Sequence, residues 1–280
     1  MCRLFGLTAG PARVSAAFWL LDAPDSLDAE SRRNPDGAGI GWFDGDGRPE
    51  VEKHPDPAYD DPAFTRTART ATSRTFVAHV RLATTGAHTV DNTHPFLAEG
   101  RLMAHNGGFG DLDAIDAELG DYRRLVHGDT DSERFLALVT KRTDEHDGDV
   151  SAGITAAAGW IAANLPMYSL NLVLIEDGEL WALRYPDQRA LHVLARSPRP
   201  GGAVDGWEAS GSRLRVRATA VTPTVVVASE RLDDDPGWRM LDPGELLHVR
   251  PDLTVDSQVA LPDPPAHLHL LDEKDPNIDT

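Results

Sequence analysis

The sequence predicts an α+β sandwich rather than a doubly wound parallel sheet. Segments with strand character occur in runs, two helical segments follow one another directly, and a regular alternation of strand and helix is missing. The chain has 280 residues, of which 41% are hydrophobic. It can therefore bury one substantial core or two modest ones without disulfides or a structural metal. We expect a single domain over residues 2–260.

Elements of the first half are expected where apolar residues recur at strand or helix spacing. Short apolar or β-branched runs predict strands over residues 2–8, 38–43, 75–80 and 102–104. Spacings of three and four predict helices over residues 12–21, 131–141 and 152–163, the second beginning at a cap on Asp129 or Thr130. A turn cluster at 44–47 is typical of a hairpin, and residues 55–62 are expected to form a loop.

The second half is richer in strands. A hairpin is expected from residues 170–175 and 180–185 around a turn at 176–179, and further strands over 191–194, 224–228 and 245–249. Residues 196–207, rich in Pro and Gly, predict an excursion loop. Residues 261–280 contain prolines and acids and are expected to form a tail.

Charge and cysteine content exclude several classes of protein. The chain has 27 Lys plus Arg against 45 Asp plus Glu, a formal charge of -18, which repels nucleic acid and anionic membrane surfaces. A single cysteine cannot form an internal disulfide. No signal peptide and no run of about 18 apolar residues is visible. A cytoplasmic protein without nucleic-acid or membrane partners is expected.

The cysteine is Cys2, directly after the initiator methionine. A small residue at this position permits removal of the methionine, which leaves Cys2 with a free α-amine. An unperturbed α-amine has a pKa of about 7.7 to 8.0, so it can accept the thiol proton and later deliver a proton to a leaving amine. The alternative is a buried structural cysteine near a flexible terminus. Three downstream segments favour a nucleophile.

Each of these segments has a chemical and a structural interpretation. Arg81 lies just past a predicted strand beside hydroxyls and a turn glycine, and its planar fork suits a carboxylate, although a surface ion pair is the alternative. The Asn106 amide and the Gly107 N–H suit a developing oxyanion, although Asn-Gly is also a common turn. In the acidic stretch 128–133 one carboxylate suits a substrate ammonium, while helix capping by one aspartate is the alternative.

Four histidines suggest a competing metal site, because imidazole is a common metal ligand. They are His79, His88, His94 and His105. No close pair such as H-E-x-x-H occurs among them, and His79 and His105 lie at predicted strand ends, where a hydrogen-bonded structural histidine is the usual finding. We expect no metal and no cofactor, and supporting roles for His79, His94 and His105.

Five motifs together make the sequence resemble the class II glutamine amidotransferases, which are N-terminal nucleophile hydrolases. The motifs lie within residues 2–133, in family order: Cys2, the H-x-R-x-A-T-x-G stretch at 79–86, Asn92-Thr93-His94-Pro95, His105-Asn106-Gly107 and Thr130-Asp131-Ser132-Glu133. Synthase-type members usually begin Cys-Gly and carry Trp and His where this chain has Leu82 and Thr85. The start Cys2-Arg3-Leu4 instead resembles the stand-alone branch, which includes an ergothioneine-pathway γ-glutamyl amidohydrolase.

The resemblance implies a fold, a reaction and a set of residues. The fold is a four-layer αββα sandwich. The reaction is cleavage of the γ-amide of glutamine or of a γ-glutamyl compound through a glutamyl thioester on Cys2. Asn106 and Gly107 would form the oxyanion hole, and the glutamyl head would be held by Arg81, Thr84 and Asp131. An ammonia-accepting synthase in trans is a possible partner, and a catalytically silent binding or regulatory protein is the alternative.

Overall fold

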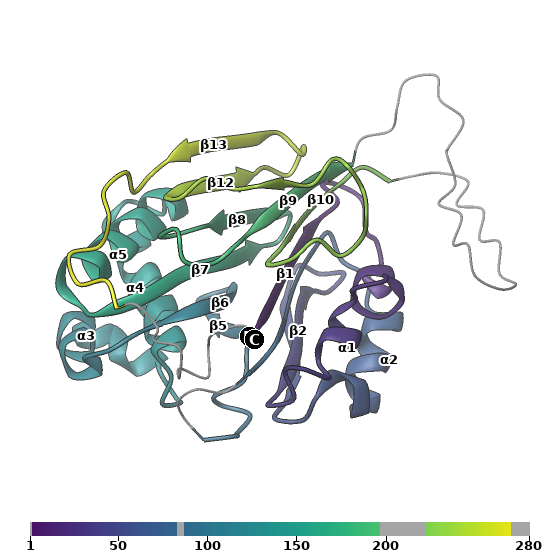
Figure 1. The fold of residues 1–280 in the computed structure, drawn as a ribbon, viewed down its shortest axis with the longest axis horizontal. Coiled ribbons are helices and arrows are strands. Elements are labelled where there is room, and N and C mark those ends of the chain that lie inside the picture. Colours follow the sequence, from purple (N-terminus) through teal and green to yellow (C-terminus); the bar gives the residue numbers. More distant parts are fainter. Residues whose placement is uncertain (1, 83–86, 197–221, 270–280) are drawn as a thin grey trace, which may run out of the picture.

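Two antiparallel sheets pack face to face, and helices cover their outer faces (Figure 1). The structure is a computed structural model, and it describes residues 2–82, 87–196 and 222–269. The first sheet has seven strands in the order β11 (Arg239–Met240), β9 (His192–Arg196), β10 (Thr224–Ala228), β1 (Arg3–Thr8), β4 (Thr75–Val80), β2 (Ala38–Phe43), β3 (Pro49–His54). The second has six, in the order β13 (Val255–Val259), β12 (Glu245–Val249), β8 (Glu179–Leu183), β7 (Met167–Glu176), β6 (Arg101–Phe109), β5 (Phe96–Ala98).

The helices form the two outer layers and confirm the predicted αββα sandwich. Helices α1 (Leu27–Glu30) and α2 (Pro62–Thr70) lie against the first sheet, with a π-helical turn at Phe18–Asp22 and a 3-10 turn at Ala58–Asp60. The second sheet is covered by α3 (Leu112–Leu119), α4 (Asp131–Glu145) and α5 (Val150–Asn164), with a 3-10 helix at Gly120–Leu125 after α3.

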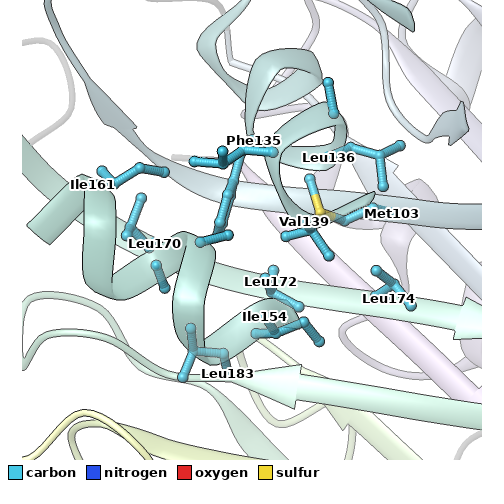
Figure 2. Packing of buried hydrophobic residues seen from close by; sticks show 14 of the residues in the cluster. Met103, Phe135, Leu136, Val139, Ile154, Ile161, Leu170, Leu172, Leu174 and Leu183 are labelled. Carbon is cyan, nitrogen blue, oxygen red and sulfur yellow. The ribbon is translucent and has the colours of Figure 1, made fainter. Parts of the chain in front are cut away.

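Successive side chains of a strand point alternately toward the other sheet and toward the helices, so the apolar residues form separate clusters on the two faces of each sheet. Leu4 of β1 and Val173 of β7 belong to the cluster between the sheets, while Phe5 belongs to the cluster under α1 and α2. On the far side, Phe135 of α4 and Ile154 of α5 pack onto β6, β7 and β8 (Figure 2). Because successive strand residues face opposite sides, every central strand is buried on both faces.

Two glycines of β2 make room for a chain crossing between the sheets. A Cβ atom at Gly39 would lie 2.2 Å from the His94 carbonyl oxygen, and one at Gly41 would lie 3.0 Å from Pro95 Cγ. The backbone of residues 94–95 therefore rests directly on β2. This crossing carries His94 into the space between the sheets.

Sheet register brings distant residues to one end of the molecule. Strand β1 lies between β4 and β10, with Arg3 paired to Val80 and Leu4 paired to His79. Cys2, just before β1, and Arg81, just after β4, therefore emerge side by side. The facing sheet contributes β6, whose Asn106 pairs with Asn171 of β7.

The predicted helix over residues 12–21 is wrong in its first part. Val14 forms an isolated β-bridge with Ser73, with N···O distances of 2.9 and 3.0 Å between the two residues. The Arg13 guanidinium also donates to three backbone carbonyls, including that of Phe43 at 3.0 Å. These bonds hold the segment extended, and only Phe18–Asp22 forms a helical turn.

The other differences concern the length of predicted elements and elements that the sequence pattern did not predict. The strand expected over 102–104 is β6, which runs on through Asn106-Gly107-Gly108 because these residues pair with β7. The loop expected over 55–62 contains the turn Ala58–Asp60 and the first residue of α2. Elements α1, β3, β5, β11, β13, α2 and α3 were not predicted, although Asp61 as N-cap before Pro62 is a helix-start signal.

Residues 261–269, the beginning of the expected tail, lie against α5 and β7. The Ala266 N–H donates to the Ala162 carbonyl at 2.8 Å, and the Met167 N–H donates to the His267 carbonyl at 3.1 Å. Residues 270–280, and all but the first residue of the expected loop at 196–207, lie outside the described residues. No helix in the described part of the chain combines the length and apolarity needed to cross a bilayer.

Candidate active site

The Cys2 thiol lies at the end of the first sheet, against the backbone of Leu82. The Leu82 N–H donates to Cys2 Sγ at 3.1 Å, and the thiol lies 3.3 Å from the Leu82 carbonyl oxygen. Burial raises the pKa of the thiol above its ordinary value, while the Leu82 N–H and the charge of Arg81 act in the opposite direction. The thiol therefore needs a base to form a thiolate near neutral pH.

The Asn106 side chain joins the two sheets at this thiol-bearing residue. Its Nδ2 donates to the Cys2 carbonyl oxygen at 2.9 Å, and its Oδ1 lies 3.1 Å from His79 Nε2. Asn106 is buried and lies on β6, while His79 belongs to β4 of the first sheet and Cys2 directly precedes β1 of that sheet. Asn106 thus links Cys2 and His79 through its two side-chain hydrogen bonds.

Two buried histidines, one of them bonded to Asn106, pack against each other with tilted rings. The ring centroids of His79 and His94 are 4.2 Å apart, with 36° between the planes. Burial lowers the pKa of His79 to about 3 and that of His94 well below its ordinary value. Neither ring nitrogen of His94 has a hydrogen-bond partner among the described residues. Both imidazoles are therefore neutral at physiological pH.

His105 points to the opposite face of β6, toward the helices. Its Nδ1 lies 2.9 Å from Ser132 Oγ, and its Nε2 lies 3.2 Å from the Ser169 carbonyl oxygen. Burial lowers the pKa of His105. The residue links β6 to the first turn of α4 and does not face Cys2.

Gly107 occupies a position that only glycine tolerates. Its φ is +150°, and a Cβ atom there would lie 1.8 Å from the Ser169 carbonyl oxygen. The next residue, Gly108, has ordinary space, since its Cβ would lie 3.7 Å from Asp131 Oδ2. The backbone beside Asn106 is thus held tightly against β7.

Arg81 and Asp131 approach the same region from different layers. Arg81 is buried, its Nη1 donates to the Ala87 carbonyl at 3.4 Å, and burial lowers its pKa against the opposing charges of Cys2, Asp36 and Asp131. Asp131 is the first residue of α4, and its Oδ2 accepts the Phe109 N–H at 3.1 Å. Thr84, the third residue expected to bind substrate, lies outside the described residues.

The N-cap of α4 is Thr130, one of the two predicted candidates. Its hydroxyl accepts the Glu133 N–H at 3.3 Å. The Glu133 carboxylate turns back to accept the N–H groups of His127 and Gly128, at 3.1 and 2.7 Å. The stretch therefore caps α4, as the structural alternative expected, but the cap is Thr130 and not one of the aspartates.

Two residues near the site were not singled out individually from the sequence. One is Leu82, whose backbone contacts the thiol. The other is Asn92, which is 1% exposed, donates to the Ala87 carbonyl at 3.1 Å and accepts the Asp129 N–H at 2.8 Å. Asn92 could have been found because it belongs to one of the motifs that carry the family resemblance. Leu82 contacts the thiol through backbone atoms, which every residue type has, so its identity could not have indicated the contact.

The histidines do not assemble a metal site within the part of the chain that the structure describes. No three His, Cys, Asp or Glu side chains there are grouped so as to hold a metal ion. His79 and His105 are instead engaged with protein groups on opposite faces of the sheets.

Comparison with known proteins identifies relatives over nearly the whole length. The family model described as class-II glutamine amidotransferases matches residues 1–267. The chain is 28% identical to a putative glutamine amidotransferase, YafJ, of Escherichia coli, over 88% of this chain and 96% of that protein. It is 29% identical to the gamma-glutamyl-hercynylcysteine sulfoxide hydrolase of Mycobacterium tuberculosis, over 89% and 93%.

Solved structures agree on the fold. A glutamine aminotransferase class-II domain protein from Silicibacter pomeroyi superposes with a TM-score of 0.62 at 19% identity, covering 92% of this chain and 98% of that one. The glutamine phosphoribosylpyrophosphate amidotransferase of B. subtilis gives a TM-score of 0.65 at 18% identity, covering 94% of this chain but 50% of that one.

Proposed function

The chain belongs to the class II glutamine amidotransferases, enzymes of amide-bond chemistry, and we propose that it hydrolyses the γ-amide of glutamine or of a γ-glutamyl compound through a glutamyl thioester on Cys2. One observation carries the proposal: the Asn106 amide nitrogen lies 2.9 Å from the carbonyl oxygen of Cys2. This bond joins the residue that carries the thiol to an amide N–H donor on the opposite sheet. Thioester chemistry needs this pairing of nucleophile and oxyanion donor.

The first half of the reaction forms the thioester. With Met1 removed, the α-amine of Cys2 accepts the thiol proton, and Sγ attacks the γ-carbonyl carbon of the substrate. The carbonyl π electrons move to oxygen, where Asn106 Nδ2 and the Gly107 N–H stabilise the negative charge. The tetrahedral intermediate collapses, the C–N bond breaks, and the leaving nitrogen takes the proton from the α-ammonium.

The second half regenerates the enzyme. Water attacks the thioester carbonyl carbon while the α-amine takes a proton from it, and the same two donors hold the oxyanion. The C–S bond then breaks, the thiolate recovers the proton from the α-ammonium, and glutamate leaves. The thiol pKa raised by burial makes this return of the proton favourable.

The glutamyl head group is assigned to Arg81 and Asp131. We expect Arg81 to bind the α-carboxylate, together with Thr84, and Asp131 to bind the α-ammonium. Opposite charges of the two side chains match the two charges of an α-amino acid. The engaged position of Asp131, held by the Phe109 N–H at 3.1 Å, supports a preorganised site.

Two substrates are compatible with this mechanism, and they differ in the leaving group. Ammonia would be the product if glutamine is the substrate, and a synthase acting in trans would then consume it. An amine would be the product if a larger γ-glutamyl amide is hydrolysed, which is the activity named for the Mycobacterium tuberculosis relative. The 29% identity to that hydrolase, over 89% of this chain, supports the second of these substrates.

A substrate panel tests the proposal. Glutamine and a series of γ-glutamyl amides are incubated with the enzyme, and glutamate release is measured for each. Asn106→Ala should lower kcat by about 10² to 10³, since it removes one oxyanion donor, and leave KM nearly unchanged. Mass spectrometry should find Met1 absent and a glutamine-analogue electrophile attached to Cys2.

Matched variants make the test decisive. Cys2→Ala should abolish glutamate release, whereas Asn164→Ala, on an exposed end of α5, should not alter it. A catalytically silent binding protein would bind the panel and release no glutamate. Retention of Met1 in a fully active enzyme, or full activity of Asn106→Ala, would contradict the mechanism.

A further inference from the structure

The contact with Cys2 identifies which atom of the Asn106 amide is nitrogen and which is oxygen. The Cys2 carbonyl oxygen can only accept a hydrogen bond, so the Asn106 atom 2.9 Å away must be the amide nitrogen. The amide oxygen is then the atom that lies 3.1 Å from His79 Nε2. Because a carbonyl oxygen accepts only, His79 Nε2 must carry a hydrogen.

This assignment defines the state of His79. A neutral imidazole carries one hydrogen, which here is on Nε2, so Nδ1 is bare. Nδ1 is buried and has no partner among the described residues, so the opposite tautomer would place a buried N–H without an acceptor there. The ring is also packed against His94, with centroids 4.2 Å apart. Tautomer and ring position both favour donation to Asn106.

We propose that His79 is a positioning residue for the amide cleavage: its Nε2–H holds the Asn106 side chain with the nitrogen toward Cys2, so that the amide donates to the developing oxyanion. The inference rests on the proposed function, in which Asn106 is an oxyanion donor. His79 itself does not touch the substrate or the thiol and takes no proton.

The physical reason for such a residue is the near symmetry of an asparagine side chain. A 180° rotation exchanges Oδ1 and Nδ2 with little change in shape, and the rotated amide would direct a lone pair at the Cys2 carbonyl and at the oxyanion. The Nε2–H of His79 disfavours the rotated amide, because the Asn106 Nδ2 and the His79 Nε2 would then be two donors facing each other without an acceptor. A preorganised dipole costs no reorganisation at the moment of reaction.

Two amide variants of His79 separate positioning from packing. In His79→Gln the terminal amide nitrogen reaches about as far as Nε2, and in His79→Asn it stops one bond short. We expect kcat of His79→Gln within about threefold of wild type, kcat of His79→Asn reduced about 10- to 100-fold, and KM changed less than about twofold in both. Thermal unfolding of both variants is measured to check that they are equally stable.

A double-mutant cycle provides the decisive readout. If His79 acts through Asn106, then His79→Asn should reduce kcat less than about twofold in the Asn106→Ala background, because the amide it positions is gone. A loss of about 10-fold or more in that background would show an independent effect and overturn the inference. Equal kcat values for His79→Gln and His79→Asn would also overturn it.

The outcomes distinguish this inference from the function on which it rests. Full activity of Asn106→Ala alone would remove the oxyanion role and with it the proposed mechanism. A disabled Asn106→Ala combined with additive effects of His79→Asn would leave the mechanism intact and remove only the positioning role. Labelling of Cys2 by a glutamine-analogue electrophile, followed by mass spectrometry, checks that every variant keeps a folded site.

Discussion

The two parts of the candidate site are held in place in different ways. The strand-held part consists of Cys2, His79, Asn106 and Gly107. The loop-held part consists of Arg81, residues 87–92 and residues 128–131. Sheet register fixes the first, with Asn106 bonded to Cys2 and His79 across the two sheets. The second depends on side-chain bonds to loop carbonyls and N–H groups. In the proposed mechanism, bond cleavage thus takes place on rigid strands, and the head group is bound by connections between elements.

The largest expected effect tests the rigidity of the strand-held part. Gly107→Ala places a Cβ 1.8 Å from the Ser169 carbonyl oxygen at a φ of +150°, so β6 and β7 must separate. We expect a loss of about 3 kcal/mol or more in unfolding free energy and of nearly all glutamate release. Gly108→Ala, with 3.7 Å to its nearest neighbour, should retain both. Equal stability of the two variants in thermal unfolding would contradict the comparison.

Arg81 tests the loop-held part through substrate affinity. Arg81→Gln removes a charged partner of the α-carboxylate and should lower kcat/KM for glutamine about 10²-fold, mainly through KM, and Arg81→Lys about tenfold. Steady-state kinetics with 4-aminobutanamide, which lacks the α-carboxylate, supplies the control. Wild type and both variants should process this amide equally well. A similar loss with both amides would mean that Arg81 acts elsewhere.

Low pH should lower the unfolding free energy of the protein, because His79 in the strand-held part has a lowered pKa. Its pKa is about 3 in the folded protein and about 6.5 when unfolded, so the unfolded chain binds more protons between these values. Unfolding free energy therefore falls as pH falls below about 6.5, by about 2 kcal/mol from His79 alone between pH 7 and 5. Denaturant unfolding at both pH values should show a drop smaller by that amount in His79→Gln. An unchanged drop would contradict the prediction.

The smallest expected effect concerns Asn92, which joins the two loops of the loop-held part. Asn92→Ala removes its bonds to Ala87 and Asp129 and should raise KM for glutamine about tenfold with kcat preserved. Thr93→Val is the matched control, because it removes one buried bond to Thr89 within a single loop. It should cost similar stability and leave KM unchanged. A fall in kcat for Asn92→Ala would place the residue in the strand-held part.

The sequence predicted the strand-held part better than the loops around it. Cys2 precedes one short apolar run, and Asn106 and Gly107 follow another, so their association with strands could be inferred from pattern and residue type. The extension of β6 through Asn106 and Gly107 could not. The resemblance added their order along the chain. What it did not supply was the bond between Asn106 and the Cys2 carbonyl, because contacts across two sheets depend on register and sheet packing.

Helix 12–21 shows where the sequence pattern failed. Its apolar spacing satisfied helical periodicity, yet the β-bridge of Val14 to Ser73 and the bonds of Arg13 to distant carbonyls hold the chain extended. Such long-range hydrogen bonds override local propensity. His105 shows a related limit: its sequence neighbour Asn106 faces Cys2, so only strand alternation indicates that His105 faces the helices.

The central place of β1 has a consequence for the timing of synthesis. One neighbour, β4, begins at residue 75, but the other, β10, begins at residue 224. At about 5–20 residues per second, the ribosome makes β10 roughly 10 to 40 seconds after β1. Throughout that interval the first strand lacks one of its two partners. The removal of Met1 that the proposed mechanism requires would therefore precede closure of the first sheet.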